Sequence, residues 1–214
     1  MRGQRIVAVI TKLSAALSLA FLFNACAINR NIEVSNTHLV SNVSGMSKAK
    51  KVQWAKVSPG FNFADYKSVY IPEVRLEGQA KGSSLGQTLA HDLRERILRE
   101  LGKKYPVTAD EAASTGEGKR ATLQLALSEI ESGDGFVRWF IGTGIASTVL
   151  QVEGRVTETG SDEPVLEFVR HRSFDGYPFM GLNVTVFSAK ATHRTSMKEI
   201  ARDIAAFLGK AGSE

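Results

Sequence analysis

ATLQLALS, residues 121–128, is the stretch from which the fold can be worked out. Its leucines occupy every second position, and such a period of two places them on one face of a β-strand. LQVEGRVT, residues 150–157, alternates in the same way, and VLEFVRHRSF, residues 165–174, is a third strand with apolar side chains on both faces. The polar turn TGSDE, residues 159–163, predicts a hairpin between the last two strands. Together these segments predict an antiparallel meander.

Shorter elements precede the meander. SVYI, residues 68–71, is predicted to be a strand that ends at a proline, and YPVT, residues 105–108, a brief edge strand. Between them, leucine or isoleucine recurs at every fourth position from Leu85 to Leu101. This spacing predicts an amphipathic helix that ends at Gly102, and Ser84 to Gln87 has the spacing of a capping box at its start.

A second helix is predicted after the meander. Ser196 to Glu199 again has capping-box spacing, and an apolar stripe continues from Met197 to Leu208, just before Gly209. Each helix has one apolar stripe and each strand of the meander offers an apolar face, which suits two packed layers. We therefore predict an α+β fold in which two helices pack on one face of a mostly antiparallel sheet of four to five strands.

The first 26 residues have the parts of an export signal. Three basic residues are followed by an apolar run at residues 13–23, which suits the core of a signal peptide, whereas a membrane-spanning helix needs ~20 residues. Cys26, the only cysteine of the chain, follows directly and resembles the acylated cysteine of bacterial lipoproteins. The alternative is an ordinary secretory cleavage, for which residues 25–27 also offer a site.

The predicted organisation follows from this anchor. Ala27, rather than aspartate, comes after the cysteine, so by resemblance acyl chains would hold the protein in the outer membrane, on its periplasmic face. The next segment is rich in Asn, Ser, Thr and Lys without a sustained period, which predicts a flexible tether. We expect a signal peptide at residues 1–25, a lipidated N-terminus and tether at 26–57, and a single domain at 58–214.

Charge and missing motifs exclude several classes of function. The chain has 27 basic residues, and three of them lie in the leader, so the mature protein has 24 basic and 22 acidic residues. This excess of positive charge is too small to indicate nucleic-acid binding. The motifs of serine hydrolases, zinc proteases, paired-cysteine sites and phosphate loops are absent from the sequence, and the histidines lack zinc-binding spacing. His171 is expected on an exposed strand face. We predict a protein that is not an enzyme, with no cofactor and no metal.

Two connections in the meander are candidates for contact with a partner or a membrane. In an up-and-down meander, the connection after the first strand and the one after the third leave from the same end of the sheet. Both contain apolar residues where loops are usually polar, and an apolar surface patch usually marks an interface. The alternative is that these side chains close the end of the core. The candidate contact residues are Phe136, Arg138, Trp139, Phe140, Tyr177, Phe179 and Met180.

Several motifs together resemble a family of uncharacterised envelope lipoproteins of Gram-negative bacteria, domain of unknown function 4410. They are the cysteine motif, FNFADYKSVYI at residues 61–71, the capped helix, LGKKYPV at 101–107, and a central run with Arg138, Gly142, Gly144 and the turn Thr159–Gly160. The resemblance implies a small α+β domain in the cell envelope, and it supplies no catalytic residues.

These observations lead to a prediction of function. We expect a lipid-anchored, non-enzymatic module that binds a partner protein, associates with itself or helps an assembly. One alternative is an envelope enzyme or small-ligand binder with a pocket that no motif reveals. Another is a component of a membrane-associated pore or secretion assembly.

Overall fold

The computed structural model describes residues 37–114, 117–131, 148–174 and 189–211. All of them belong to one compact unit, Val34–Glu214; the other unit, Met1–Glu33, lies outside the described residues. The strands and helices are β1 (Ser47–Lys48), β2 (Trp54–Val57), β3 (Ser68–Tyr70), β4 (Arg75–Leu76), α2 (Ser84–Leu101), β5 (Val107–Thr108), β6 (Arg120–Glu131), β7 (Thr148–Glu158), β8 (Pro164–Phe174) and α4 (Ala189–Leu208).

One mixed sheet of eight strands organises the fold. Its order is β1-β2-β8-β7-β6-β3-β5, and β4 also pairs with β6. The predicted antiparallel meander is confirmed as β6, β7 and β8, whereas β3 and β4 run parallel to β6. The predicted number of four to five strands is too low, because β1, β2 and β4 have only two to four residues each. Segments this short carry no readable alternation.

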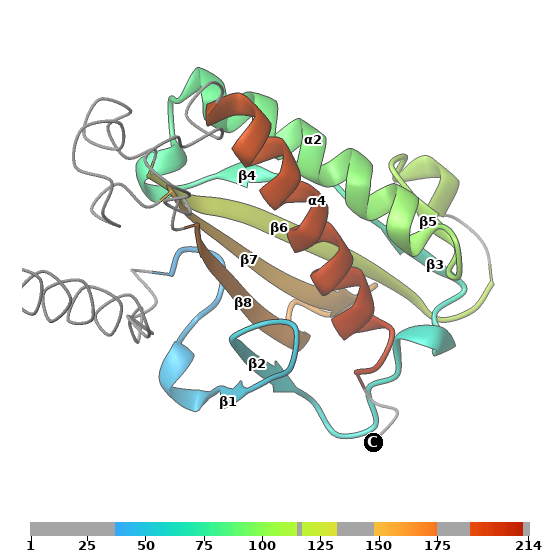
Figure 1. The fold of residues 1–214 in the computed structure, drawn as a ribbon. Helices are drawn as coiled ribbons and strands as arrows, with labels where there is room; N and C mark the ends of the chain where they lie inside the picture. The colour runs from blue at the N-terminus through green and yellow to red at the C-terminus, as the bar shows by residue number, and fades with distance from the viewer. Residues whose placement is uncertain (1–36, 115–116, 132–147, 175–188, 212–214) are drawn as a thin grey trace, which may run out of the picture. The chain divides into compact units, whose positions relative to one another are not determined.

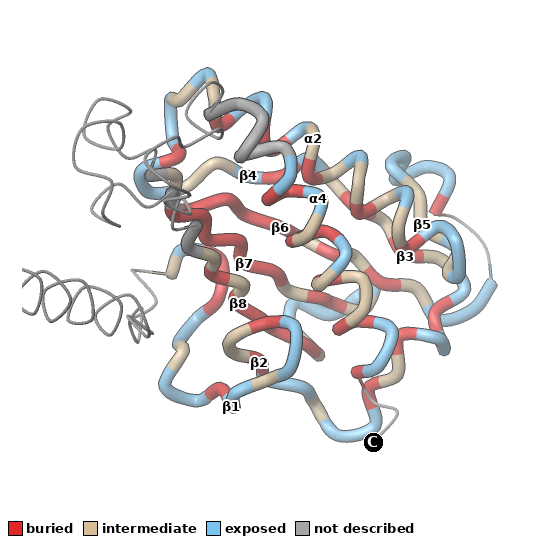
Figure 2. The backbone as a smooth tube through the Cα atoms, in the orientation of Figure 1, coloured by how far each residue is buried: buried red, intermediate tan, exposed pale blue. Residues whose placement is uncertain are grey.

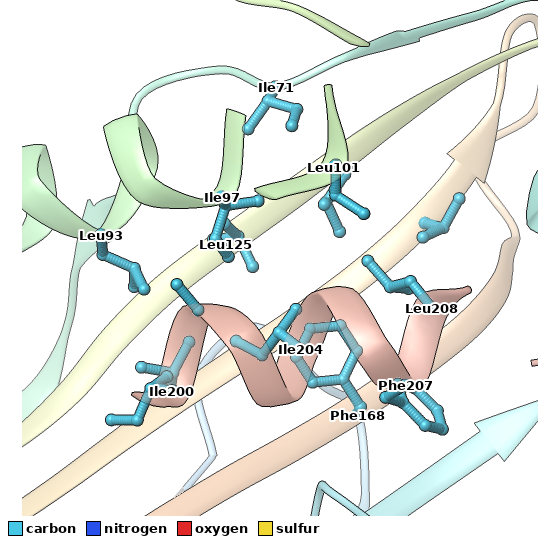
Figure 3. Packing of buried hydrophobic residues seen from close by; sticks show 14 of the residues in the cluster. Ile71, Leu93, Ile97, Leu101, Leu125, Phe168, Ile200, Ile204, Phe207 and Leu208 are labelled. Atoms are coloured by element: carbon cyan, nitrogen blue, oxygen red, sulfur yellow. The ribbon is translucent and has the colours of Figure 1, made fainter. Parts of the chain in front are cut away.

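Both helices lie side by side on one face of the sheet, as predicted (Figure 1). Each turns its apolar stripe inward, so that Leu93 of α2 and Ile204 of α4 have no exposed surface. Together with Leu125 of β6 and Phe168 of β8 they belong to one apolar cluster, part of which Figure 3 shows. The three long strands are buried along most of their length (Figure 2). The core is therefore the layer between the helices and the meander.

Gly154 makes room for the largest side chain on the sheet's inner face. It lies directly opposite Phe168, and a Cβ built on Gly154 would be 2.2 Å from the ring carbon Cζ of Phe168. The ring thus occupies the space that a side chain at residue 154 would need. On its other side Phe168 packs edge-on against Phe207 of α4, with 5.7 Å between the ring centroids. This contact joins the sheet to the C-terminal helix.

Both helices begin earlier than the capping motifs predicted. Ser83 is the N-cap of α2, and its hydroxyl accepts a hydrogen bond from the backbone N–H of Gly86 at 3.1 Å. Helix α4 begins at Ala189, so Ser196 lies inside it, fully buried. The capping-box spacing is the same in a helix interior as at a helix start, which explains the second error.

Residues 37–57, which the composition predicts to be part of a flexible tether, are packed on the sheet instead; we call them the strap. Strand β2 pairs with β8, from Trp54 opposite Val169 to Val57 opposite Leu166, and β1 pairs with β2. Val40 and Met46 pack against Val169 and form a small apolar cluster. The strap docks mainly through backbone hydrogen bonds and a few apolar side chains, and a polar composition does not reveal such contacts.

We expect truncation of either central helix residue to be costly. Leu93→Ala or Ile204→Ala would leave a cavity in a close-packed core, so the free energy of unfolding should fall by ~2–5 kcal/mol. Urea denaturation of the purified protein measures this change. Glu95→Ala on α2 and Lys198→Ala on α4 are matched controls at exposed positions. They should change stability by less than ~0.5 kcal/mol, and an equally small effect of the core substitutions would contradict the packing.

Candidate functional site

The face of the sheet opposite the helices is polar, and we call it the polar face. The alternation that sends leucine side chains toward the helices sends the intervening residues the other way. The strand register aligns these residues across the sheet. A polar group buried without a partner is costly, so each one needs a hydrogen-bond partner. Buried polar residues on this face include Ser128, Gln151, Glu153, Glu167 and His171.

Glu153, in the middle of β7, fastens the strap to the polar face. Its Oε2 atom accepts hydrogen bonds from the backbone N–H groups of His38, Leu39 and Val40, at 2.8, 2.7 and 3.2 Å. Consecutive N–H groups that converge on one oxygen form a nest for an anion, and hydrogen bonds to a charged acceptor are the stronger kind. Although Glu153 has no exposed surface, its charge is therefore compensated by the strap.

Neighbouring side chains complete this attachment. The other carboxylate oxygen of Glu153 accepts a hydrogen bond from Gln151 Nε2 at 3.3 Å, and the same nitrogen donates to Ser128 Oγ at 3.0 Å. One strand away, Glu167 Oε1 accepts from the backbone N–H of Ser41 at 3.3 Å. Buried carboxylates on adjacent strands thus hold four consecutive residues of the strap.

Gln53 closes the edge of β8 beyond the end of β2. Its Oε1 accepts a hydrogen bond from the backbone N–H of His171 at 2.7 Å, and its Nε2 donates to the carbonyl oxygen of His171. The side-chain amide therefore imitates the peptide group that a longer β2 would have offered. This pairing covers part of an edge that could otherwise add another strand.

Asp203 of α4 links the strap to the helix layer. One of its oxygens lies 3.1 Å from Lys51 Nζ, and the other lies 3.0 Å from Arg170 Nη2 of β8. Burial lowers the pKa of Arg170, and the nearby Asp203 carboxylate opposes that shift. Next along β8, Arg172 pairs with Glu199 of α4. These ion pairs join the strap, the sheet and α4.

His171 is buried rather than exposed, which corrects the prediction. The strap and the neighbouring strands leave its side chain 2% exposed, with Nε2 3.6 Å from Glu129 Oε2. Burial lowers the pKa of His171, the Glu129 carboxylate partly opposes this effect, and Arg170 adds to it. These effects together favour the neutral imidazole.

The described surface offers few other chemical features. Within the described ranges, no group of three or more His, Cys, Asp or Glu side chains is placed to hold a metal ion. Neither α2 nor the described α4 is long and apolar enough to cross a membrane. Among large hydrophobic residues in the part of the chain that the structure describes, Val57 is the one that is exposed, at 40%.

The residues predicted to carry function lie outside the described residues. The structure does describe where the segments that carry them begin and end. The register pairs Glu131 with Val149 and Thr148 with Phe174, so β6 ends, β7 begins and β8 ends at one end of the sheet, as the meander predicted. We call it the loop end, and the end with the β7–β8 turn the turn end. The residues concerned are Cys26, Phe136, Arg138, Trp139, Phe140, Tyr177, Phe179 and Met180.

The sequence contained only a weak signal for the residues that hold the strap. Glu153 and Glu167 stand inside predicted strands, where a charged residue usually faces water. Alternation assigns a face to each of them, but it does not say that another segment covers that face.

We expect Glu153→Ala to release the strap. The substitution would leave three backbone N–H groups without their acceptor, which should destabilise the protein by ~3 kcal/mol or more. Hydrogen exchange should show faster exchange at residues 38–41 than in the unsubstituted protein, while β6 and β7 stay protected. Glu163→Ala, in the exposed turn, is the matched control. Unchanged protection of residues 38–41 would show that Glu153 does not hold them.

Solved structures with a similar fold come from several Gram-negative bacteria. A variant of the PelC dodecamer from Paraburkholderia phytofirmans is 12% identical, with a TM-score of 0.46, 72% of this chain covered and 97% of that chain. Protein XCC0632 from Xanthomonas campestris is 6% identical, with a TM-score of 0.41. The match covers 74% of this chain and 93% of that chain. A minor lipoprotein from Acinetobacter baumannii is 12% identical, with a TM-score of 0.34. The match covers 67% of this chain and 93% of that chain.

Comparison with family models identifies the chain more directly. No curated protein matches the sequence, but the model described as "Domain of unknown function (DUF4410)" matches residues 32–206. The match starts ahead of the strap, which is therefore part of the family's domain, and it extends into α4. The predicted resemblance is confirmed: this chain belongs to the family known as domain of unknown function 4410.

Proposed function

We propose that the protein is a lipid-anchored module of the Gram-negative cell envelope that binds a partner protein or another copy of itself without catalysing a reaction. Acyl chains on Cys26 hold it to the periplasmic face of the outer membrane. The partner contact is made by the apolar residues of the two segments between β6 and β7 and between β8 and α4.

The observation that supports this proposal is the register of the meander. Because Glu131, Thr148 and Phe174 lie at the loop end, both apolar segments are attached to the same end of the sheet. The centre of a protein interface is usually apolar and rich in aromatic residues. The described surface has little to offer of that kind, whereas the two segments contain Phe136, Trp139 and Tyr177.

The polar face supports a binding role more than a catalytic one. Its carboxylates at Glu153 and Glu167 are engaged by backbone N–H groups of the strap. His171, the buried imidazole, is closed to solvent. A catalytic acid or base must come within hydrogen-bond reach of its substrate, and these groups contact the protein's own chain instead.

We expect the mature protein to begin with an acylated cysteine. Mass spectrometry of the N-terminal peptide should find acyl chains on Cys26. Each methylene of such a chain that is buried in the bilayer contributes ~0.8 kcal/mol, so more than one chain makes the anchoring durable. Cys26→Ser should leave an unprocessed precursor or a protein released from the membrane fraction. A mature N-terminus at Ala27 or later would contradict lipid anchoring.

We expect Trp139→Ala to weaken association without weakening the fold. If Trp139 is an interface anchor, cross-linking in the intact envelope should lose the cross-linked species, while the Tm of the purified protein stays the same. The matched control is the other tryptophan, Trp54, which packs in the strap cluster with Val169. Trp54→Ala should lower Tm and leave cross-linking intact. A large fall in Tm with unchanged cross-linking for Trp139→Ala would instead show that its side chain belongs to the core.

A further inference from the structure

We infer that the strap is an acid-sensitive latch, which stays closed while His171 is neutral and opens when its imidazole is protonated. The latch is closed in the structure, where β2 pairs with β8 and the start of the strap is bound to Glu153. In the open state the strap, residues 37–57, leaves the polar face and the edge of β8. None of these contacts involves the lipid anchor or the two apolar segments of the proposed function.

His171 lies on the face of the sheet that the strap crosses. Side chains along β8 alternate between the two faces, so the ring of His171 is on the same side as Val169, two residues earlier. The strap residues Val40 and Met46 pack against Val169. The strap also holds the backbone of His171, because the side-chain amide of Gln53 binds both its N–H and its carbonyl oxygen. The state of the ring and the position of the strap can therefore affect each other.

The site accommodates a neutral imidazole better than a charged one. The side chain of His171 is 2% exposed, and its Nε2 lies 3.6 Å from Glu129 Oε2, which is longer than a normal hydrogen bond. The Nδ1 atom is buried, and among the residues that the structure describes it has no hydrogen-bond partner. A neutral imidazole can leave Nδ1 without a proton, whereas protonation turns it into a donor that lacks an acceptor. The closed latch therefore penalises the charged ring.

Charged groups near His171 come from every element around it. Burial lowers the pKa of His171 most, the Glu129 carboxylate on β6 opposes this effect, and Arg170 on β8 adds to it. The other charged or titratable groups are engaged by the strap, paired across the sheet and α4, or exposed. They are Glu153, Glu167, Arg172, Glu199, Asp203, Lys51 and His38. Glu129 is thus the acidic group that favours protonation of the ring, and burial outweighs it.

The direction of the pH dependence follows from the lowered pKa. In the open state water reaches the ring, and the pKa of His171 returns to about 6.5, the value of an unperturbed histidine. Because its pKa is lower in the closed state, the open state binds the proton more tightly, and a falling pH favours opening. Closure is fully favoured above about pH 6.5 and weakens below that value. Between pH 7.5 and 5.5 the ratio of open to closed strap rises by up to about tenfold.

Opening uncovers backbone groups that can bind another chain. In the closed state β2 occupies the edge of β8 from Leu166 to Val169, and Gln53 continues this cover at His171. An edge strand without its neighbour presents a row of free N–H and C=O groups, to which another strand can add. Acid therefore converts a covered edge of the sheet into one that is open to pairing.

Hydrogen exchange of the purified protein at pH 7.5 and 5.5 tests the latch. After correction for the intrinsic effect of pH on exchange, the N–H groups of residues 38–41 and of His171 should lose protection several-fold, and at most about tenfold, at the lower pH. Protection in the middle of β6 and β7 should stay the same. Equal protection of the strap at both pH values would overturn the inference. An equal loss in the strap and in β6 would also overturn it, because the whole domain would then be opening.

Single substitutions assign the response to one imidazole. His171→Gln removes the titrating group and keeps a polar side chain, so protection of residues 38–41 should no longer differ between the two pH values. His91→Gln on α2 and His38→Gln in the strap are matched controls at exposed positions, and both should keep the response. A response that persists in His171→Gln would show that another group opens the strap, and its loss in His38→Gln would assign it to that ring instead. Either result would overturn the role of His171.

The ring can also be titrated directly, which decides the matter even if His171→Gln does not fold. In the unsubstituted protein, the NMR signals of the His171 ring report its protonation. At pH 6.5, where an unperturbed histidine is half protonated, these signals should still be those of a mostly neutral imidazole. A half-protonated ring at this pH, with residues 38–41 still protected, would overturn the inference.

Discussion

The attachment of three backbone N–H groups to the Glu153 carboxylate is the contact on which the polar side of this protein depends. A carboxylate without exposed surface needs donors, and three consecutive residues of the strap supply them. Once these residues are held, β2 can pair with β8, Val40 and Met46 can cover Val169, and Gln53 can reach the backbone of His171. The strap in turn shields the carboxylate from water, so each half of the contact requires the other.

The two faces of the sheet are stabilised in different ways. On the helix face, apolar side chains such as Leu93, Ile204 and Phe168 exclude water, and the stabilisation scales with the area that they bury. On the polar face, directional hydrogen bonds fix one segment in one position. Apolar packing tolerates small shifts, whereas a nest of N–H groups around a single oxygen does not. The polar face is therefore suited to fix where the strap begins, and the helix face to supply the stability of the domain.

The parts of the fold that could be predicted from sequence are those with a long repeating pattern. Twelve residues of β6 and eighteen of α2 repeat often enough for their period to be recognised. Strand β4 has only two residues, and the strap has no repeating pattern. Their positions are set by partners more than forty residues away along the chain. Of the candidate site, the sequence placed two apolar segments at one end of the sheet. It did not reveal the function of Glu153, because alternation identifies a face and not the segment that covers it.

The strap also constrains the order in which the protein can fold. His38, Leu39 and Val40 bind a residue 113 to 115 positions further along the chain, and contacts of such long range form late because a large loop must close first. The chain is synthesised from its N-terminus, so the first part of the domain to be made is among the last to find its place. Until β7 and β8 exist, the strap has no binding surface.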